Sequence, residues 1–391
     1  MKIAKLITIV AMFTMLVTPV FAARDDSKAF GQFQEFLEGI DQKSFETIRK
    51  YVDQADLTNR VLSHQAVQAD VQDMFRNDFW NAVERGILHV LPPKGSRVKP
   101  ELIQFEFENG KGRAVVRFSY PNYEFQFQQY DLRYDGRGRL KVVDWFDSSK
   151  GETFSAFMGE ELLAAKPEKE ASRKLLSSNA PTDLQLFQAT EILKAIRDRQ
   201  APRFFEIYDK FDEPLKREPW IAKNAVYMAQ IMKDVDRFSR AVVIFADLYS
   251  EDPDMGLMLS DYYVTLQDYE QSFAALQKFE QHFSVSEGAL PAKLSALALA
   301  IGRPDDAEKF AVKATTSEPE LELGWWSLLR ARSVVEDYQG ALEALTHLED
   351  DFGHRLDAGK LGRDKFRAFT KLAASQEFKD WRAQRNQQHD R

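Results

Sequence analysis

The side chains best suited by type to move a proton lie between residues 130 and 144, where apolar and polar residues alternate. They are Tyr130, Asp131, Tyr134 and Asp144, with His89 further upstream. Proton transfer needs a carboxylate and a partner within hydrogen-bonding reach, and a pKa shifted by burial. Asp144 is the best single candidate, because bulky apolar residues flank it on both sides. In the opposing interpretation both aspartates face solvent and pair with Arg133 or Lys141, while the tyrosines pack.

These candidates need a sheet to position them. Apolar and polar residues alternate with a period of two from residue 102 to residue 146, and Asn109-Gly110 is typical of a tight turn. The sequence therefore predicts an antiparallel meander. The apolar positions of its third segment change from odd to even numbers: Phe125 and Phe127, then Tyr130, Leu132 and Tyr134. Such a change predicts a β-bulge near Gln128 and Gln129.

Helical patterns flank the predicted sheet within a domain that we place at residues 25–165. Apolar residues recur at steps of three and four in residues 30–52 and 71–87, and again in residues 153–163. Helices on one face of a curved antiparallel sheet make an α+β fold. The order of elements resembles the nuclear-transport-factor-2-like cone, with a cystatin-like sheet as the rival. The cone resemblance implies a pocket that serves catalysis, ligand binding or dimerisation.

Further along, one helical-hairpin pattern occurs three times between about residues 256 and 353. A small residue near the start of each second helix recurs as Ser272, Ala307 and Ala341. The steps between them are roughly 34 to 35 residues, which is the period of one helical hairpin. A fourth copy is indicated around Ala241, and its distance to Ser272 is shorter than that period by about one helical turn. Unrelated amphipathic helices are the alternative.

The hairpins resemble the tetratricopeptide repeat (TPR). The residues that carry the resemblance are Trp325-Trp326-Ser327-Leu328 with Asp337-Tyr338, then Gly302, Ala307, Ala314 and Pro319, and finally Tyr263. Leu329 and Arg332 depart from the family pattern. The resemblance implies an all-α solenoid over residues 181–391, whose first helices line a concave groove.

Groove-facing positions of the resemblance fall on four residues, which are our candidates for partner binding: Asp261, Tyr262, Trp326 and Arg330. Exposed aromatic and arginine side chains are enriched in binding hot spots. The alternative for Trp326 is that it packs against the adjacent repeat.

Composition and motifs exclude several classes of function. The formal net charge is −8, and loss of Lys2 and Lys5 with a leader leaves −10. An acidic chain repels nucleic acid and anionic membranes, so neither is expected as a partner. The absence of cysteine rules out disulfides and thiolate metal ligands. No phosphate loop and no histidine pair at metal-binding spacing occurs, so we predict no cofactor, no metal and no catalytic residue.

The segment 1–22 has the features of a secretory signal peptide. Lys2 and Lys5 precede an apolar run over residues 6–17, and small residues end at Ala22 and Ala23. The run is shorter than the roughly 20 residues that span a bilayer. We therefore expect an exported, periplasmic protein with no membrane insertion after cleavage; an uncleaved anchor is the alternative.

Residues 166–180 are charged and poor in bulky apolar residues, which predicts a linker between the two domains. The combined interpretation is an exported, non-enzymatic scaffold that binds a protein or peptide through its repeats. One alternative places a ligand-binding or enzymatic pocket in the N-terminal domain, with the repeats as a docking arm. Another makes that domain a homodimerisation module, which an exposed apolar sheet face would favour.

The signal-peptide assignment predicts the start of the mature chain. Protein purified from the exported fraction should have the intact mass of a chain that begins at Ala23 or Arg24, because the small residues form the cleavage site. Mass spectrometry measures this directly. Recovery of the full-length mass in the membrane fraction would instead support the anchor.

Overall fold

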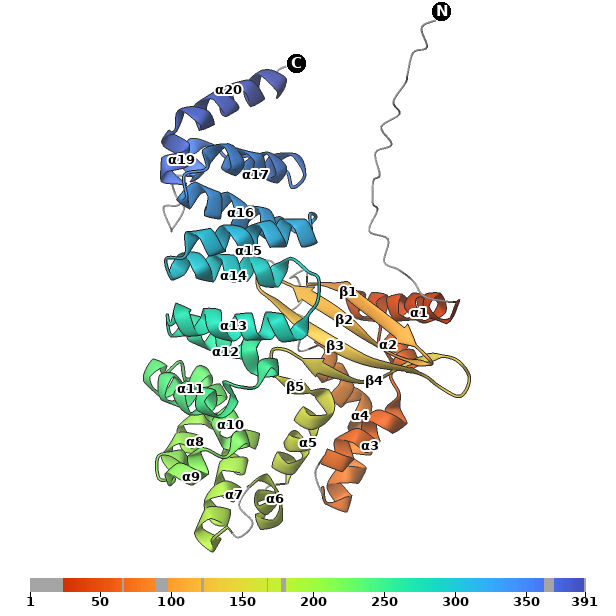
Figure 1. Ribbon diagram of the computed structural model, residues 1–391. Helices are drawn as coiled ribbons and strands as arrows, with labels where there is room; N and C mark the ends of the chain where they lie inside the picture. Colours follow the sequence, from red (N-terminus) through yellow and green to blue (C-terminus); the bar gives the residue numbers. More distant parts are fainter. Residues whose placement is uncertain are drawn as a thin grey trace, which may run out of the picture.

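The computed structural model describes residues 24–64, 67–88, 98–120, 123–166, 168–176, 181–361 and 369–389. Figure 1 shows an N-terminal domain built on a sheet, and a stack of helical hairpins that runs past one side of it. The predicted order, an α+β domain followed by a helical solenoid, is confirmed. The predicted signal peptide (1–22) and His89 lie outside the described residues.

Four helices precede the sheet: α1 (Arg24–Asp41), α2 (Phe45–Tyr51), α3 (Gln54–His64) and α4 (Ala69–Leu88). In α1 the apolar residues fall on one face, because they recur at helical spacing. Phe33 and Phe36 on that face are fully buried, and their rings lie 5.7 and 5.5 Å from the ring of Tyr130. The helices thus cover the inner face of the sheet.

The sheet is a five-stranded antiparallel meander in the order β1-β2-β3-β4-β5. Its strands are β1 (Lys99–Glu108), β2 (Lys111–Ser119), β3 (Phe125–Tyr134), β4 (Leu140–Asp147) and β5 (Glu152–Thr153), followed by α5 (Phe154–Ala165). Asn109 and Gly110 form the first tight turn with φ of 52° and 77°. The meander predicted from the alternating pattern is therefore confirmed.

The bulge predicted near Gln128 and Gln129 is wrong. β3 pairs with β2 without interruption, and the register of the β3–β4 pair shifts only between Asp131 and Leu132. The odd-to-even change in the sequence has another cause, because both faces of β3 are covered. Phe127 packs on the solenoid, whereas Tyr130 packs on the N-terminal helices.

The predicted linker is partly folded. Residues 169–175 form helix α6 (Lys169–Leu175), in which Ala171 and Leu175 are buried. Both belong to the same apolar cluster as Leu186 and Ile192 of the next helix. A short helix with only a few apolar residues can pack in this way because its neighbours supply most of the core.

The solenoid consists of helical hairpins stacked side by side (Figure 1). Its elements are α7 (Asp183–Arg197), α8 (Ala201–Tyr208), α9 (Glu213–Lys216), α10 (Pro219–Met232), α11 (Val235–Tyr249), η1 (Pro253–Met255), α12 (Gly256–Thr265), α13 (Tyr269–Phe283), α14 (Ala289–Ala300), α15 (Pro304–Ser317), α16 (Glu322–Val334), α17 (Tyr338–Asp350), α18 (Ala358–Leu361), α19 (Thr370–Ala374) and α20 (Gln376–His389). Among the described residues, no helix is both long enough and apolar enough to cross a membrane.

A left-handed residue ends the first helix of five successive hairpins: Arg199, Lys233, Gln267, Gly302 and Glu336. Each follows the one before it by roughly 34 to 35 residues, the period of one helical hairpin. The next residue is the N-cap of the second helix. In three hairpins it is an aspartate whose carboxylate accepts a backbone N–H three positions on: Asp234, Asp268 and Asp337. These five hairpins therefore turn in the same way.

This common turn corrects the spacing predicted for the fourth copy. Four positions after each N-cap come Phe238, Ser272, Ala307 and Ala341, and all four are buried. Phe238 therefore occupies the position that the sequence pattern assigned to Ala241. The junction has the same period as the other hairpins, and no helical turn is missing. A phenylalanine in a position of small residues hid the repeat.

The outer face of the sheet packs on the solenoid. Phe127 is fully buried, and its ring lies 4.9 Å from that of Phe283 and 6.4 Å from that of Phe279. Val115 of β2 joins the same apolar cluster as Leu290 of α14. The two domains thus share a core, which the sequence did not predict.

Replacement of Phe127 by alanine tests this shared core. We expect Phe127→Ala to lower the free energy of unfolding by about 3–5 kcal/mol, because it removes a fully buried ring. Phe187→Ala is the matched control; Phe187 is 58% exposed on α7, so a change within about 0.5 kcal/mol is expected. Urea denaturation measures both. Equal losses for the two variants would contradict the packing described.

Candidate functional site

Tyr130, one of the predicted pocket residues, is part of the core. Its hydroxyl donates a hydrogen bond to the side-chain oxygen of Gln128, and its ring is fully buried. Burial raises the pKa of Tyr130 well above its ordinary value. Tyr134 is half-buried, with its ring 4.8 Å from that of Phe107. Both tyrosines pack, as the opposing interpretation held.

Asp144 is buried and holds the start of α5. Its carboxylate accepts hydrogen bonds from the backbone N–H of Trp145 (2.9 Å) and from the N–H and hydroxyl of Ser155 (3.2 and 2.5 Å). Burial raises the pKa of Asp144, although these bonds oppose the shift. The carboxylate therefore has a structural role that accounts for its burial.

Asp131 and Asp144 lie next to each other in the sheet, but neither forms the ion pair with Arg133 or Lys141 that the solvent-facing interpretation expected. The two residues are direct partners across β3 and β4, with Asp131 half-buried. Arg133 pairs instead with Asp53, at 2.8 Å, and Lys141 donates to the backbone oxygen of Lys50. Neither cation thus bonds to the aspartates it was expected to neutralise.

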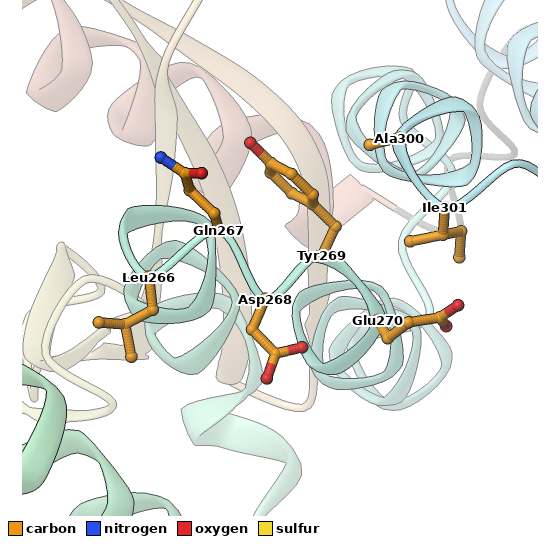
Figure 2. Close-up of a pocket in the computed structure, with 7 residues that line it drawn as sticks. All are labelled: Leu266, Gln267, Asp268, Tyr269, Glu270, Ala300 and Ile301. Atoms are coloured by element: carbon orange, nitrogen blue, oxygen red, sulfur yellow. The ribbon is translucent and has the colours of Figure 1, made fainter.

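A shallow depression lies on the edge of the solenoid, at the turns inside two hairpins. Figure 2 shows its lining, which comes from the α12–α13 turn and from the end of α14: Leu266, Gln267, Asp268, Tyr269, Glu270, Ala300 and Ile301. Its volume is about 420 Å³. Its carboxylates are engaged, because Asp268 caps α13 and Glu270 pairs with Arg303 at 3.2 Å.

Two of the predicted partner-binding residues occupy equivalent places. Asp261 and Arg330 each lie seven positions before the N-cap of the second helix in their own hairpins. Asp261 is exposed and accepts a hydrogen bond from the ammonium group of Lys293 in the next hairpin. The guanidinium carbon of Arg330 lies 5.9 Å from the ring centroid of Phe369.

The structure places the other two differently. The ring of Tyr262 packs between Phe238 and Phe245 of the preceding hairpin, at 5.6 and 5.8 Å. Trp326 is half-buried, with its indole N–H bonded to the carboxylate of Glu322 at 2.9 Å and its ring 5.2 Å from that of His354. Trp326 thus contacts Glu322 of its own helix and His354, which follows α17. Tyr262 packs against the preceding hairpin.

The N-terminal domain contacts the starts of four consecutive first helices. Lys223 of α10 pairs with Glu152 (2.9 Å) and with Glu160. Gly151, with φ of 67°, brings its backbone against Met255 just before α12, where a Cβ atom would lie 2.2 Å from the sulfur.

The remaining two contacts are polar. Arg117 of β2 meets Glu287 and Glu318, which precede α14 and α16. The hydroxyl of Tyr123 donates to Glu322, the first residue of α16, at 2.6 Å. Burial and this bond raise the pKa of Tyr123 to about 12.

Sequence reasoning missed this whole interface. In the sequence Arg117 is one polar residue of an alternating strand, with no sign of burial, yet its side chain is fully buried in the structure. Two signals were available: the odd-to-even change in β3, and Val115, an apolar residue on the side of β2 that carries Arg113 and Arg117. Both indicate a sheet covered on two sides, but neither says what covers it.

No protein-family model matches the chain. No curated protein matches it either. Among solved structures, the chain is similar to a mutant of MamA, with 15% identity and a TM-score of 0.30 over 42% of this chain and 94% of that one. It is also similar to MamA from Desulfovibrio magneticus RS-1, residues 41 to the end, with 13% identity and a TM-score of 0.33 over 45% of this chain and 100% of that one. Likenesses of this strength say nothing about function.

A pair of aspartate variants tests the structural role of Asp144. Asp144→Ala should lower the free energy of unfolding by about 1–3 kcal/mol, because it leaves buried donors unsatisfied. Asp131→Ala, across the strand pair, should change it by about 0.5 kcal/mol or less. Urea denaturation followed by tryptophan fluorescence compares them. If Asp144→Ala is as stable as the native chain, the role assigned to it is wrong.

Proposed function

We propose that this chain is a non-enzymatic scaffold that binds a protein or peptide partner along the first helices of its hairpins. The observation that carries the proposal is a double row of solvent-facing residues. They lie seven and three positions before the N-cap of the second helix in the hairpins from α10/α11 to α16/α17. We call these eight residues the first-helix ladder: Tyr227, Asp261, Ala296 and Arg330, with Ile231, Thr265, Ala300 and Val334.

The ladder is accessible along its length. Seven of its members are exposed and Arg330 is half-buried. Positions seven and three differ by four, so they lie on one side of a helix. Because successive first helices lie side by side in a solenoid, the rows form a continuous strip on the side that such stacks use for binding.

The chemistry of the ladder favours a partner segment with small or apolar side chains. Tyr227, Ile231 and Val334 are between 43% and 47% exposed, more than most large apolar residues of the chain. The charge of Asp261 is offset by Lys293. Ala296 and Ala300 leave the middle of the strip without long side chains, which lets a partner backbone approach closely.

The N-terminal domain supports this function as a brace. Its contacts reach four consecutive hairpins, from Lys223 to Glu322, at the ends of the first helices that precede the ladder. A solenoid whose repeats touch only their neighbours bends readily, whereas a domain bound across several repeats holds their curvature. A fixed curvature lowers the conformational cost of binding.

We propose export to the periplasm, which the basic and apolar pattern of the segment 1–22 supports.

We do not propose a dimer through the sheet, because its outer apolar residues Val115 and Phe127 are buried against the solenoid of the same chain.

Site-specific photocrosslinking tests the ladder in cells that produce the full chain. A photoreactive amino acid at Ala296 should yield a discrete crosslinked product, since that position faces the proposed partner. The matched control is Ala274, an exposed alanine on the second helix α13, which should yield about tenfold less or none. Ala300→Arg should suppress the product at position 296, because the long arginine side chain prevents a partner backbone from approaching the middle of the strip.

Two outcomes would contradict the proposal. Equal crosslinking from positions 296 and 274 would place no special surface on the first helices. Absence of any product at 296, with product at 274, would move the binding face to the outer wall.

A further inference from the structure

One arginine joins the two domains through three carboxylates. The guanidinium of Arg117 lies 2.6 Å from Glu101, 2.6 and 2.7 Å from the two oxygens of Glu318, and 3.3 Å from Glu287. It also lies 3.2 Å from the hydroxyl of Ser119. Glu101 belongs to β1, whereas Glu287 and Glu318 belong to the solenoid. The side chain of Arg117 is completely buried.

The charges in this cluster do not balance when every group is ionised. One guanidinium faces three carboxylates, which leaves an excess of two negative charges in a buried place. Lys99 relieves part of this from the solvent side, since its ammonium group lies 3.6 Å from Glu101. Glu318 is bound in a bidentate way by Arg117. The excess therefore falls on Glu287.

Glu287 is the most deeply buried of the three carboxylates, with a side chain that is 1% exposed, compared with 29% for Glu101 and 22% for Glu318. Its oxygens accept the backbone N–H groups of Ala289 (2.6 Å) and Leu290 (2.7 Å) at the start of α14. Its contact with Arg117 is the longest of the three. The charged groups that face it are thus Arg117 from β2, Glu101 from β1 and Glu318 from the α15–α16 connection.

We propose that docking of the N-terminal domain on the solenoid is coupled to the binding of one proton at Glu287, so that the brace holds more tightly in mildly acidic than in alkaline solution. The proton removes one of the two excess charges from the buried cluster. When the domains separate, Arg117 leaves and water reaches Glu287, so the ionised form is no longer penalised.

The direction follows from thermodynamic linkage. Burial raises the pKa of Glu287 from its ordinary value of 4.5 to about 7, against the effect of Arg117 and of the two backbone bonds. The docked state therefore holds the proton between about pH 4.5 and pH 7, whereas the separated state has lost it. Docking is strongest below this window, weakens as the pH rises through it, and is constant above it.

Native-state thiol labelling measures the docking equilibrium, because the chain has no cysteine of its own. Val115→Cys places a single thiol under the solenoid, and Val116→Cys places one on the opposite face, under the N-terminal helices. The labelling rate by a pyridyl disulfide, divided by the rate of a free thiol at the same pH, gives the opening constant. Val115→Cys reports separation of the domains, and Val116→Cys reports unfolding of the N-terminal domain.

From pH 5.5 to pH 8.5 the opening constant at position 115 should rise at least about tenfold, since each unit of pKa difference changes the linked equilibrium tenfold. The constant at position 116 should rise less. In the Glu287→Gln background, which keeps an oxygen for α14, the rise at position 115 should disappear. The same rise with and without Glu287 would overturn the proposal, as would equal rises at positions 115 and 116.

A second variant covers the case in which Glu287→Gln does not fold. Glu318→Gln removes the carboxylate that competes with Glu287 for Arg117, so it should lower the pKa of Glu287 and move the midpoint of the rise to lower pH. A midpoint that stays in place would also overturn the proposal. Glu108→Gln is the control, because Glu108 lies exposed at the end of β1, outside the cluster around Arg117.

Discussion

The architecture depends on a sheet that must be covered on both faces. Helices α1 to α4 cover the inner face, around Phe33, Phe36 and Tyr130. The outer face carries Val115 and Phe127, which are as apolar as the inner residues, and leaving them in water would cost part of the stability of a small domain. The solenoid supplies the second layer (Figure 1). Two chain segments that look independent in sequence therefore form one folded unit.

The parts of the fold that repeat locally could be predicted from sequence, and the part that joins distant segments could not. The meander follows from alternation in β2 and β3, and the hairpins follow from Ser272, Ala307 and Ala341 at a constant period. In the sequence, the packing of Phe127 on Phe283 is visible only as the odd-to-even change of apolar positions in β3, and a bulge would explain that change equally well. A sequence shows that a residue is apolar, but not which distant segment buries it.

The candidate site was predictable to a similar degree. Asp261 and Arg330 were predicted to bind a partner because the TPR-like pattern assigns a face to each residue of the first helix, and both belong to the proposed first-helix ladder. Tyr262 was misplaced by one position, which turns a side chain by about 100° around a helix and points it at Phe245 of the preceding hairpin. Asp144 was chosen as a candidate because apolar residues flank it, while the opposing interpretation placed it in solvent; it is buried, and its partner Ser155 belongs to the start of α5, beyond the end of the strand. The apolar flanks could be read from the sequence, whereas the partner that explains the burial could not.

The distance along the chain between the two halves of the interface affects the order of events during synthesis. Arg117 and Glu318 are 201 residues apart, and the partners of Phe127 come near residue 283. A ribosome releases the N-terminal domain first, so its outer sheet face has nothing to cover it until most of the solenoid has emerged. During that interval the chain carries an exposed apolar sheet, the kind of surface that associates with other unfinished chains. The nascent protein is thus prone to aggregation during synthesis, although the finished fold buries the apolar sheet face responsible.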